Sequence, residues 1–144
     1  MQASRLCFII LLVCGLLAGG CVNSPSHGNP GAEPAVLIVS PEFDGGVLTG
    51  DVQVEVRVTN FSPGAGHLIY YRDAVPPVDQ GRPAYSDPGT YAVSDSLVYI
   101  WHNVTPGTHT FAVQLVNPGD TPLDPPVIDA VDVTAVPQNE IAGS

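Results

Sequence analysis

The sequence predicts an all-β domain folded as a sandwich of two sheets, and three observations lead to this prediction. Residues 52–59 alternate strictly between apolar and polar side chains, which is the period of a strand buried on one face. Five other short apolar runs are bounded by turn signals such as Pro-Gly and Asn-Pro-Gly-Asp. After residue 21, no stretch repeats with the 3.6-residue period of a helix over three turns.

The expected strands are residues 35–40, 52–59, 67–72, 97–102, 108–117 and 127–136, and a seventh in residues 84–93 stays open. Residues 45–46 and 50–51 supply turns between the first two of these strands. Six or seven strands in one chain segment of this length are what an immunoglobulin-like or fibronectin-like β-sandwich needs. A closed barrel is the alternative architecture.

The N-terminal segment has the layout of an export signal. Residues 6–18 form an apolar run that follows a single charge, Arg5, and the run is shorter than the roughly 20 residues of a transmembrane helix. Residues 17–21 read L-A-G-G-C and resemble the lipobox of prokaryotic lipoproteins. The resemblance implies that Cys21 carries lipid after cleavage before it, whereas an ordinary secretory signal is the alternative.

These features divide the chain into four parts. Residues 1–20 are the expected signal peptide, and residues 21–34 are a lipidated cysteine with a flexible Pro/Gly/Ser-rich linker. Residues 35–136 are the sandwich, and residues 137–144 are a short tail. The expected location is the cell membrane, where the lipid on Cys21 would hold the exported domain facing the exterior or the periplasm.

Composition excludes several functions. The formal net charge is −10, with fourteen carboxylates, four arginines and no lysine, so phosphate backbones would be repelled and nucleic acid is excluded as a partner. The absence of lysine also excludes a Schiff base or a P-loop lysine. Cys7 and Cys14 leave with the signal, so the sandwich has no disulfide, thiol nucleophile or thiolate metal site. We expect no cofactor.

Two sets of side chains were weighed as metal ligands. Imidazoles suit copper or zinc, and three lie on separate expected strands: His67, His102 and His109. Carboxylates suit calcium, and four lie toward one edge in a spacing unlike an EF-hand loop: Asp120, Asp124, Asp129 and Asp132. Neither set outweighs a structural role, so we expect no metal. The chain also lacks a G-x-S-x-G elbow, and we expect no enzyme.

The longest connection, residues 73–96, is the candidate binding loop. It carries two tyrosines and an arginine, with a second arginine at its edge, and both residue types are common interface anchors: Arg72, Arg82, Tyr85 and Tyr91. The alternative is that the tyrosines only pin the loop to the sandwich. Trp101 is expected in the core.

Residues 103–115 read N-V-T-P-G-T-H-T-F-A-V-Q-L and resemble the L-x-P-G-x-Y-x-F-x-V corner of immunoglobulin-like and fibronectin-like modules. His109 stands where those modules place a tyrosine that bonds back to the loop backbone. We therefore expect His109 on the core face with Phe111, Val113 and Leu115, and bonded to the turn at residues 103–107.

A wider resemblance covers residues 66–73, 114–117 and 121–127. They are similar to poorly characterised immunoglobulin-like domains of secreted and lipid-anchored archaeal and bacterial proteins, which read G-H-x-H-Y-x-x-D and N-x-D-H-T-P-L. This chain has Ile69 and Asp120 where that pattern has histidines. The resemblance implies the sandwich fold and a surface location.

The expected function is a cell-surface lipoprotein whose domain serves envelope structure, adhesion or the binding of envelope proteins or glycans. An envelope metal-binding or ligand-carrying domain is the alternative. Two N-x-S/T sequons, at Asn60 and Asn103, are candidate glycosylation sites.

Overall fold

The computed structural model describes residues 31–62 and 64–140, and in these ranges the chain is built from strands and one short 3₁₀ helix. The signal segment and Cys21 lie outside the described residues. The elements in chain order are β1 (Ala35–Ser40), β2 (Gly46–Leu48), β3 (Gly50–Thr59), β4 (His67–Arg72), β5 (Tyr91–Ser94), β6 (Val98–Val104), β7 (Gly107–Val116), β8 (Pro122–Val136) and η1 (Gln138–Glu140). No helix in these ranges has the length and apolar character needed to span a bilayer.

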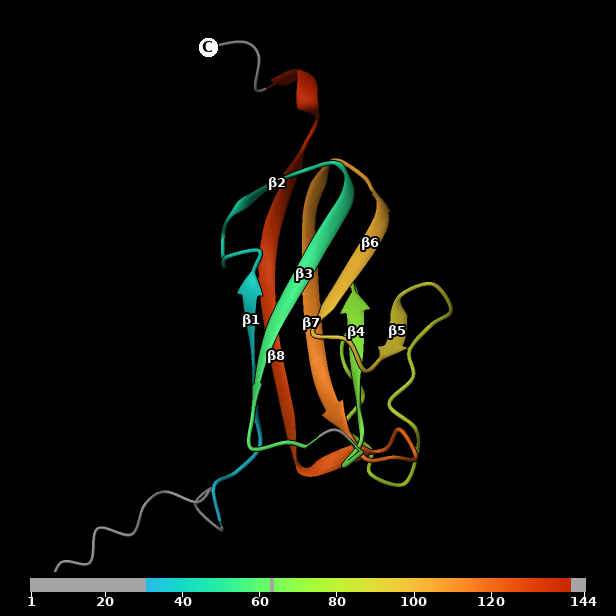
Figure 1. Ribbon diagram of the computed structural model, residues 1–144. Helices are drawn as coiled ribbons and strands as arrows, with labels where there is room; N and C mark the ends of the chain where they lie inside the picture. Colours follow the sequence, from blue (N-terminus) through green and yellow to red (C-terminus); the bar gives the residue numbers. More distant parts are fainter. Residues whose placement is uncertain (1–30, 63, 141–144) are drawn as a thin grey trace, which may run out of the picture.

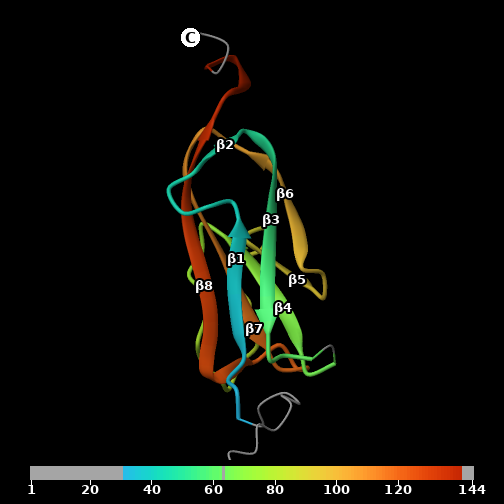
Figure 2. The same ribbon diagram turned by 60° about the vertical axis from the view of Figure 1, so that its left-hand side comes forward.

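The strands form two sheets stacked face to face, as Figures 1 and 2 show. One sheet has the order β1-β3-β6, and the other has the order β2-β8-β7-β4-β5. Every strand pair is antiparallel except β2 with β8, which is parallel. The predicted two-sheet sandwich is thereby confirmed. The closed barrel is wrong, because no ladder joins the two sheets among the described residues.

The core lies between the sheets and follows from the alternation in the sequence. Along β3, Val52, Val54 and Val56 are buried while the residues between them are exposed. They face Phe111 and other buried side chains of β4, β7 and β8. Trp101 is 5 % exposed in this cluster, so its predicted place in the core is confirmed.

The outer face of the five-stranded sheet has a cover of its own. The segment between β4 and β5 crosses this face, which buries Ile69, Ala112 and Val116. The Tyr71 hydroxyl donates to the Ala84 carbonyl at 2.6 Å, and the Gln114 amide donates to the Pro77 carbonyl at 3.0 Å. The long loop is therefore packed against the sheet.

The strands that differ from prediction are those without a simple alternation. The predicted turn at residues 45–46 overlaps the strand β2. This strand has only three residues, too few for a visible alternation, and it forms by pairing with the end of β8. The β8 strand begins at Pro122, five residues before the predicted start at 127, despite prolines that cannot donate to a ladder. The seventh strand exists as β5, and its bounds overlap residues 84–93 only in part. Part of the predicted tail folds as η1.

Candidate functional site

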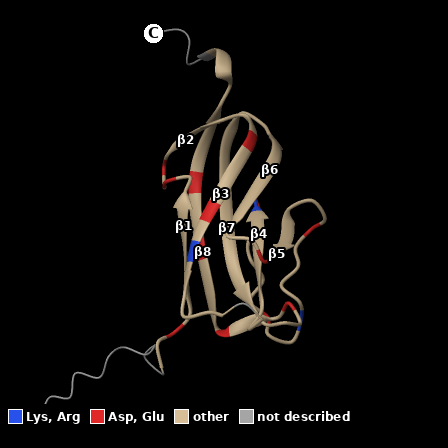
Figure 3. Cartoon of the chain, in the orientation of Figure 1, with Lys and Arg blue, Asp and Glu red and all other residues tan. Residues whose placement is uncertain are grey.

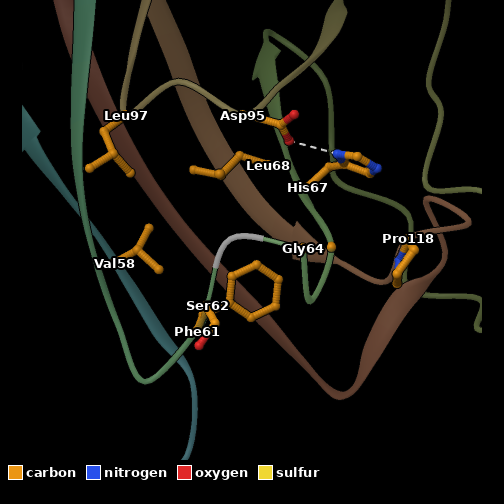
Figure 4. Close-up of a pocket in the computed structure, with 10 residues that line it drawn as sticks. Val58, Phe61, Ser62, Gly64, His67, Leu68, Asp95, Leu97 and Pro118 are labelled. Atoms are coloured by element: carbon orange, nitrogen blue, oxygen red, sulfur yellow. Dashed lines mark hydrogen bonds and ion pairs between the residues drawn. The ribbon is translucent and has the colours of Figure 1, made fainter.

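A pocket of about 540 Å³ opens at the end of the sandwich where β3 ends and β4 begins (Figure 4). It lies between the sheets, and its walls come from the ends of β3 and β4, the connection between them, the β5–β6 connection and the β7–β8 turn. The lining residues are Val58, Phe61, Ser62, Gly64, Gly66, His67, Leu68, Asp95, Leu97 and Pro118.

The pocket has an apolar interior and a polar rim. Figure 4 shows Val58, Phe61, Leu68 and Leu97 around the hollow, with His67 and its bonded partner to one side. Leu97 keeps 49 % of its surface exposed in the pocket lining. A concave site with mostly apolar walls and a few polar groups is typical of small-molecule binding.

Gly66 sets the position of the β4 strand at this pocket. Its backbone lies so close to β7 that an added Cβ would stand 1.7 Å from the carbonyl oxygen of Val116. Only glycine allows this approach. In the sequence pair Gly66-His67, the glycine is therefore required by the backbone packing, and the histidine that follows it lies at the pocket rim.

His67 is held by an ion pair with Asp95. The Nδ1 atom of His67 lies 2.6 Å from Oδ1 of Asp95, and the imidazole is 35 % exposed. The hydrogen bond to Asp95 raises the pKa of His67, and the negative charge of Asp120 and the Pro118 carbonyl add to this effect against partial burial.

The other two histidines considered as metal ligands lie away from this pocket, and each is bonded to its own aspartate. The Nδ1 atom of His102 lies 2.9 Å from Oδ1 of Asp51 at the surface. His109 lies at the start of β7, whereas His67 pairs with Val116 at the end of β7. In the described ranges no three metal-ligating side chains gather, so the convergence weighed for copper or zinc does not occur.

His109 closes the opposite end of the sandwich. Its imidazole is 12 % exposed, with Nε2 at 2.8 Å from the Thr105 carbonyl and Nδ1 at 2.7 Å from Oδ2 of Asp73. The predicted bond to the turn backbone is confirmed, whereas the bond to Asp73 was missed because it is distant in sequence. Burial lowers the pKa of His109, but the bonds to Asp73 and Thr105 outweigh it and raise the pKa. Both partners are acceptors, so both ring nitrogens donate when the ring is charged.

The aspartates weighed for calcium are engaged with the protein. The Oδ2 atom of Asp129 accepts the backbone N–H of Ile38 at 2.7 Å, and Oδ1 of Asp132 accepts the Thr110 hydroxyl at 2.6 Å. Asp120 accepts the Tyr85 hydroxyl. Three of the four aspartates therefore serve separate contacts, two from β8 and one from the β7–β8 turn, and Asp124 takes part in none of these contacts.

All four residues proposed for a binding loop have partners inside the domain, although the partner of Arg82 is loosely held. The Arg72 guanidinium lies 5.0 Å from the centre of the Trp101 ring and donates to the His102 carbonyl at 3.0 Å. Tyr85 and Tyr91 stack with ring centres 5.1 Å apart. Arg82 is exposed, with only a loose 3.6 Å pair to a neighbouring carboxylate. The loop therefore matches the pinning alternative more closely than a contact patch.

The sequence reading missed most of the pocket. The sequence pattern predicts Leu97 as the start of a strand and Asp95 as part of the long connection, and it gives Phe61 no role. They meet because three connections end at the same place in space. A signal was available in Leu97, an apolar residue flanked by Ser96 outside the alternation of β6.

Comparisons with known proteins show the fold. No protein-family model and no curated protein match this sequence. Among solved structures, the fibronectin(III)-like modules of Clostridium thermocellum CbhA superpose with a TM-score of 0.50 at 13 % identity, covering 74 % of this chain and 48 % of that chain. The domain is an immunoglobulin-like β-sandwich. An engineered protein is also similar, at 17 % identity over 73 % of this chain and 20 % of that chain, with a TM-score of 0.43. This chain thus spans less than half the length of either structure.

The two sequons of the immunoglobulin-like domain lie in different settings. Asn60 follows the end of β3 and Asn103 lies near the end of β6, and both residues are exposed with a positive φ, of 54° and 55°. The Asn60 amide donates to the Glu33 carbonyl at 3.1 Å, which fastens the start of the domain to the end of β3. Glycosylation at either asparagine stays a prediction.

Proposed function

We propose that this chain is an exported lipoprotein that displays its immunoglobulin-like domain at the cell envelope and acts there by binding. The observation that supports this most is the order along the chain: an L-A-G-G-C segment, a Pro/Gly-rich linker, and a sandwich whose first strand begins at Ala35. Lipid on Cys21 would hold the domain at the membrane. Immunoglobulin-like folds carry function on sites grafted onto the scaffold, which favours binding over catalysis.

The two ends of the domain would then face different surroundings. β1 begins at the pocket end, and β8 ends at the opposite end, as Figure 1 shows. Because the tether of residues 21–34 enters the domain at Ala35, the pocket end would lie nearer the attachment point and the β2 end farther from it. The farther end would meet envelope proteins or glycans.

A ligand-carrying domain is the second candidate, and the pocket favours it. Small-molecule sites are concave, mostly apolar and about 300–1,000 Å³ in volume, and a pocket of about 540 Å³ with a polar rim falls in this range. The metal-binding form of this alternative has less support, because each histidine pairs with a different aspartate.

Membrane fractionation tests the anchoring. We expect Cys21→Ser to release the domain from membranes or to leave the precursor uncut, while Cys14→Ser, which changes a cysteine inside the signal, behaves as wild type. Protease added to intact cells or spheroplasts should cleave the wild-type domain. A Cys21→Ser chain that is cut normally and stays membrane-bound would show that the anchor is not lipid on this cysteine.

A further inference from the structure

We propose that the pocket at the β3–β4 end binds a small organic cation, an amine with an apolar chain. This inference deepens the ligand-carrying function proposed above and rests on it. The apolar walls would take the chain, and the acidic rim would take the ammonium group.

The walls supply the apolar part of the site. Val58 and Phe61 are half-buried, and Leu68 is buried, so these three form a floor that the protein already holds in place. Leu97, at 49 % exposure, stands over this floor with its side chain available to a ligand. An apolar chain seated here would remove this surface from water.

The rim supplies the charge. Asp95 has a side-chain exposure of 77 % and bonds His67 through Oδ1, so its second oxygen remains accessible. The charge of Asp120 also reaches the His67 ring. His67 is the one basic group in the described lining, and its Nδ1 is already engaged by Asp95.

The arginines of the described residues serve elsewhere. Arg72 stacks on Trp101, Arg82 pairs with Asp79, and Arg57 is exposed on β3. Figure 3 marks acidic residues along strands of both sheets and in the loops, with few basic residues among them. An anion entering the pocket therefore meets repulsion from the net negative charge of the domain, whereas a cation is attracted by that charge and by the free oxygen of Asp95.

Calorimetry with a matched pair of probes tests the charge preference. Hexylammonium and hexanoate share one chain length and differ in the sign of the head group. The full chain is titrated in nanodiscs of zwitterionic phospholipid, with empty discs as the blank, or in plain buffer if it proves not to be anchored. We expect hexylammonium to bind about threefold to fivefold more tightly than hexanoate, which is the ratio of affinities that one exposed ion pair provides.

Two variants with matched controls locate the site. Asp95→Asn should reduce hexylammonium affinity by about threefold to fivefold, while Asp87→Asn, which removes the same charge from the β4–β5 loop, should not. Leu97→Ser should weaken the binding of hexylammonium, while Leu37→Ser, at a leucine 52 % exposed on β1, should leave it unchanged.

Binding of hexanoate as tight as hexylammonium, no binding of either probe, or equal effects of the variants and their controls would each overturn the assignment. Hexanoate binding as tight as hexylammonium would overturn the cation preference and leave the ligand-carrying function standing, whereas no binding of either probe would count against both. The anchoring proposal is tested separately by fractionation of Cys21→Ser.

Discussion

The two ends of the sandwich each carry a histidine bonded to an aspartate, yet one end is closed and the other is open. At the β7 start, His109 has a second acceptor in the Thr105 carbonyl and is 12 % exposed. At the β4 start, His67 is 35 % exposed and stands at a pocket. The surrounding backbone therefore decides whether a histidine–aspartate pair is packed into the domain, as at His109, or borders a pocket, as at His67.

The backbone next to each histidine explains the difference. Beside His109, the β6–β7 turn places the Thr105 carbonyl 2.8 Å from Nε2 of the imidazole. Beside His67, the backbone of Gly66 lies against Val116, and Phe61 of the connection from β3 packs close to this glycine. Here apolar side chains from β3, β4 and the connections line a pocket, with His67 at its rim.

The largest effect should come from the glycine that shapes the open end. Gly66→Ala places a methyl group 1.7 Å from the Val116 oxygen, so β4 or β7 must move, and we expect a loss of about 3 kcal/mol or more in the free energy of unfolding. Urea denaturation measures it. Gly119→Ala, in the β7–β8 turn with nothing within 4 Å of the new methyl group, should be neutral. Equal stability of the two variants would contradict the close approach.

The next effect should separate the two histidines. His109→Ala leaves the Thr105 carbonyl and Asp73 without their partner at a nearly buried position, so we expect a loss of about 1–3 kcal/mol. His67→Ala, at an exposed rim, should leave the free energy of unfolding nearly unchanged. Thermal melts of the two variants measure the loss of stability. A larger loss in His67→Ala than in His109→Ala would contradict the assignment of His109 to the closed end.

A smaller effect should appear in the pH dependence of stability. The pKa values of His109 and His67 are both raised above 6.5 in the folded state, so protonation favours folding. This contribution is complete below pH 6.5 and is lost as the pH rises through the raised pKa values. We expect denaturation midpoints to fall from pH 6 to pH 8.5, with His109→Ala and His67→Ala each removing part of the slope. A midpoint that rises with pH over this window would be inconsistent with protonated histidines.

Sequence patterns predicted the features that depend on residues close together in the chain. The strand at Ala35–Ser40 and the strand at His67–Arg72 match their predicted bounds, because β-branched and apolar runs mark them locally. The bond from His109 to its own turn was predicted for the same reason. Asp73, the other partner of His109, is 36 residues away and carries no local mark.

The pocket could not be predicted in this way. It is a gap between sheets, and its walls come from connections whose spacing along the chain says nothing about their meeting in space. The β2 strand was missed for a related reason, since its pairing partner lies at the far end of the chain. The candidate loop shows the reverse case: residues that share one sequence segment, such as Arg72 and Tyr85, go to different partners.

The parallel pairing of β2 with the end of β8 has a mechanical consequence. β1 begins at one end of the sandwich and β8 finishes at the other, so a pull between the two ends runs along the strands (Figure 1). The hydrogen bonds of β1 with β3 and of β2 with β8 cross between strands. Such a pull would load each set in shear, with its bonds sharing the force, whereas peeling would break them one after another. The domain is thereby suited to bear tension applied between the start of β1 and the end of β8.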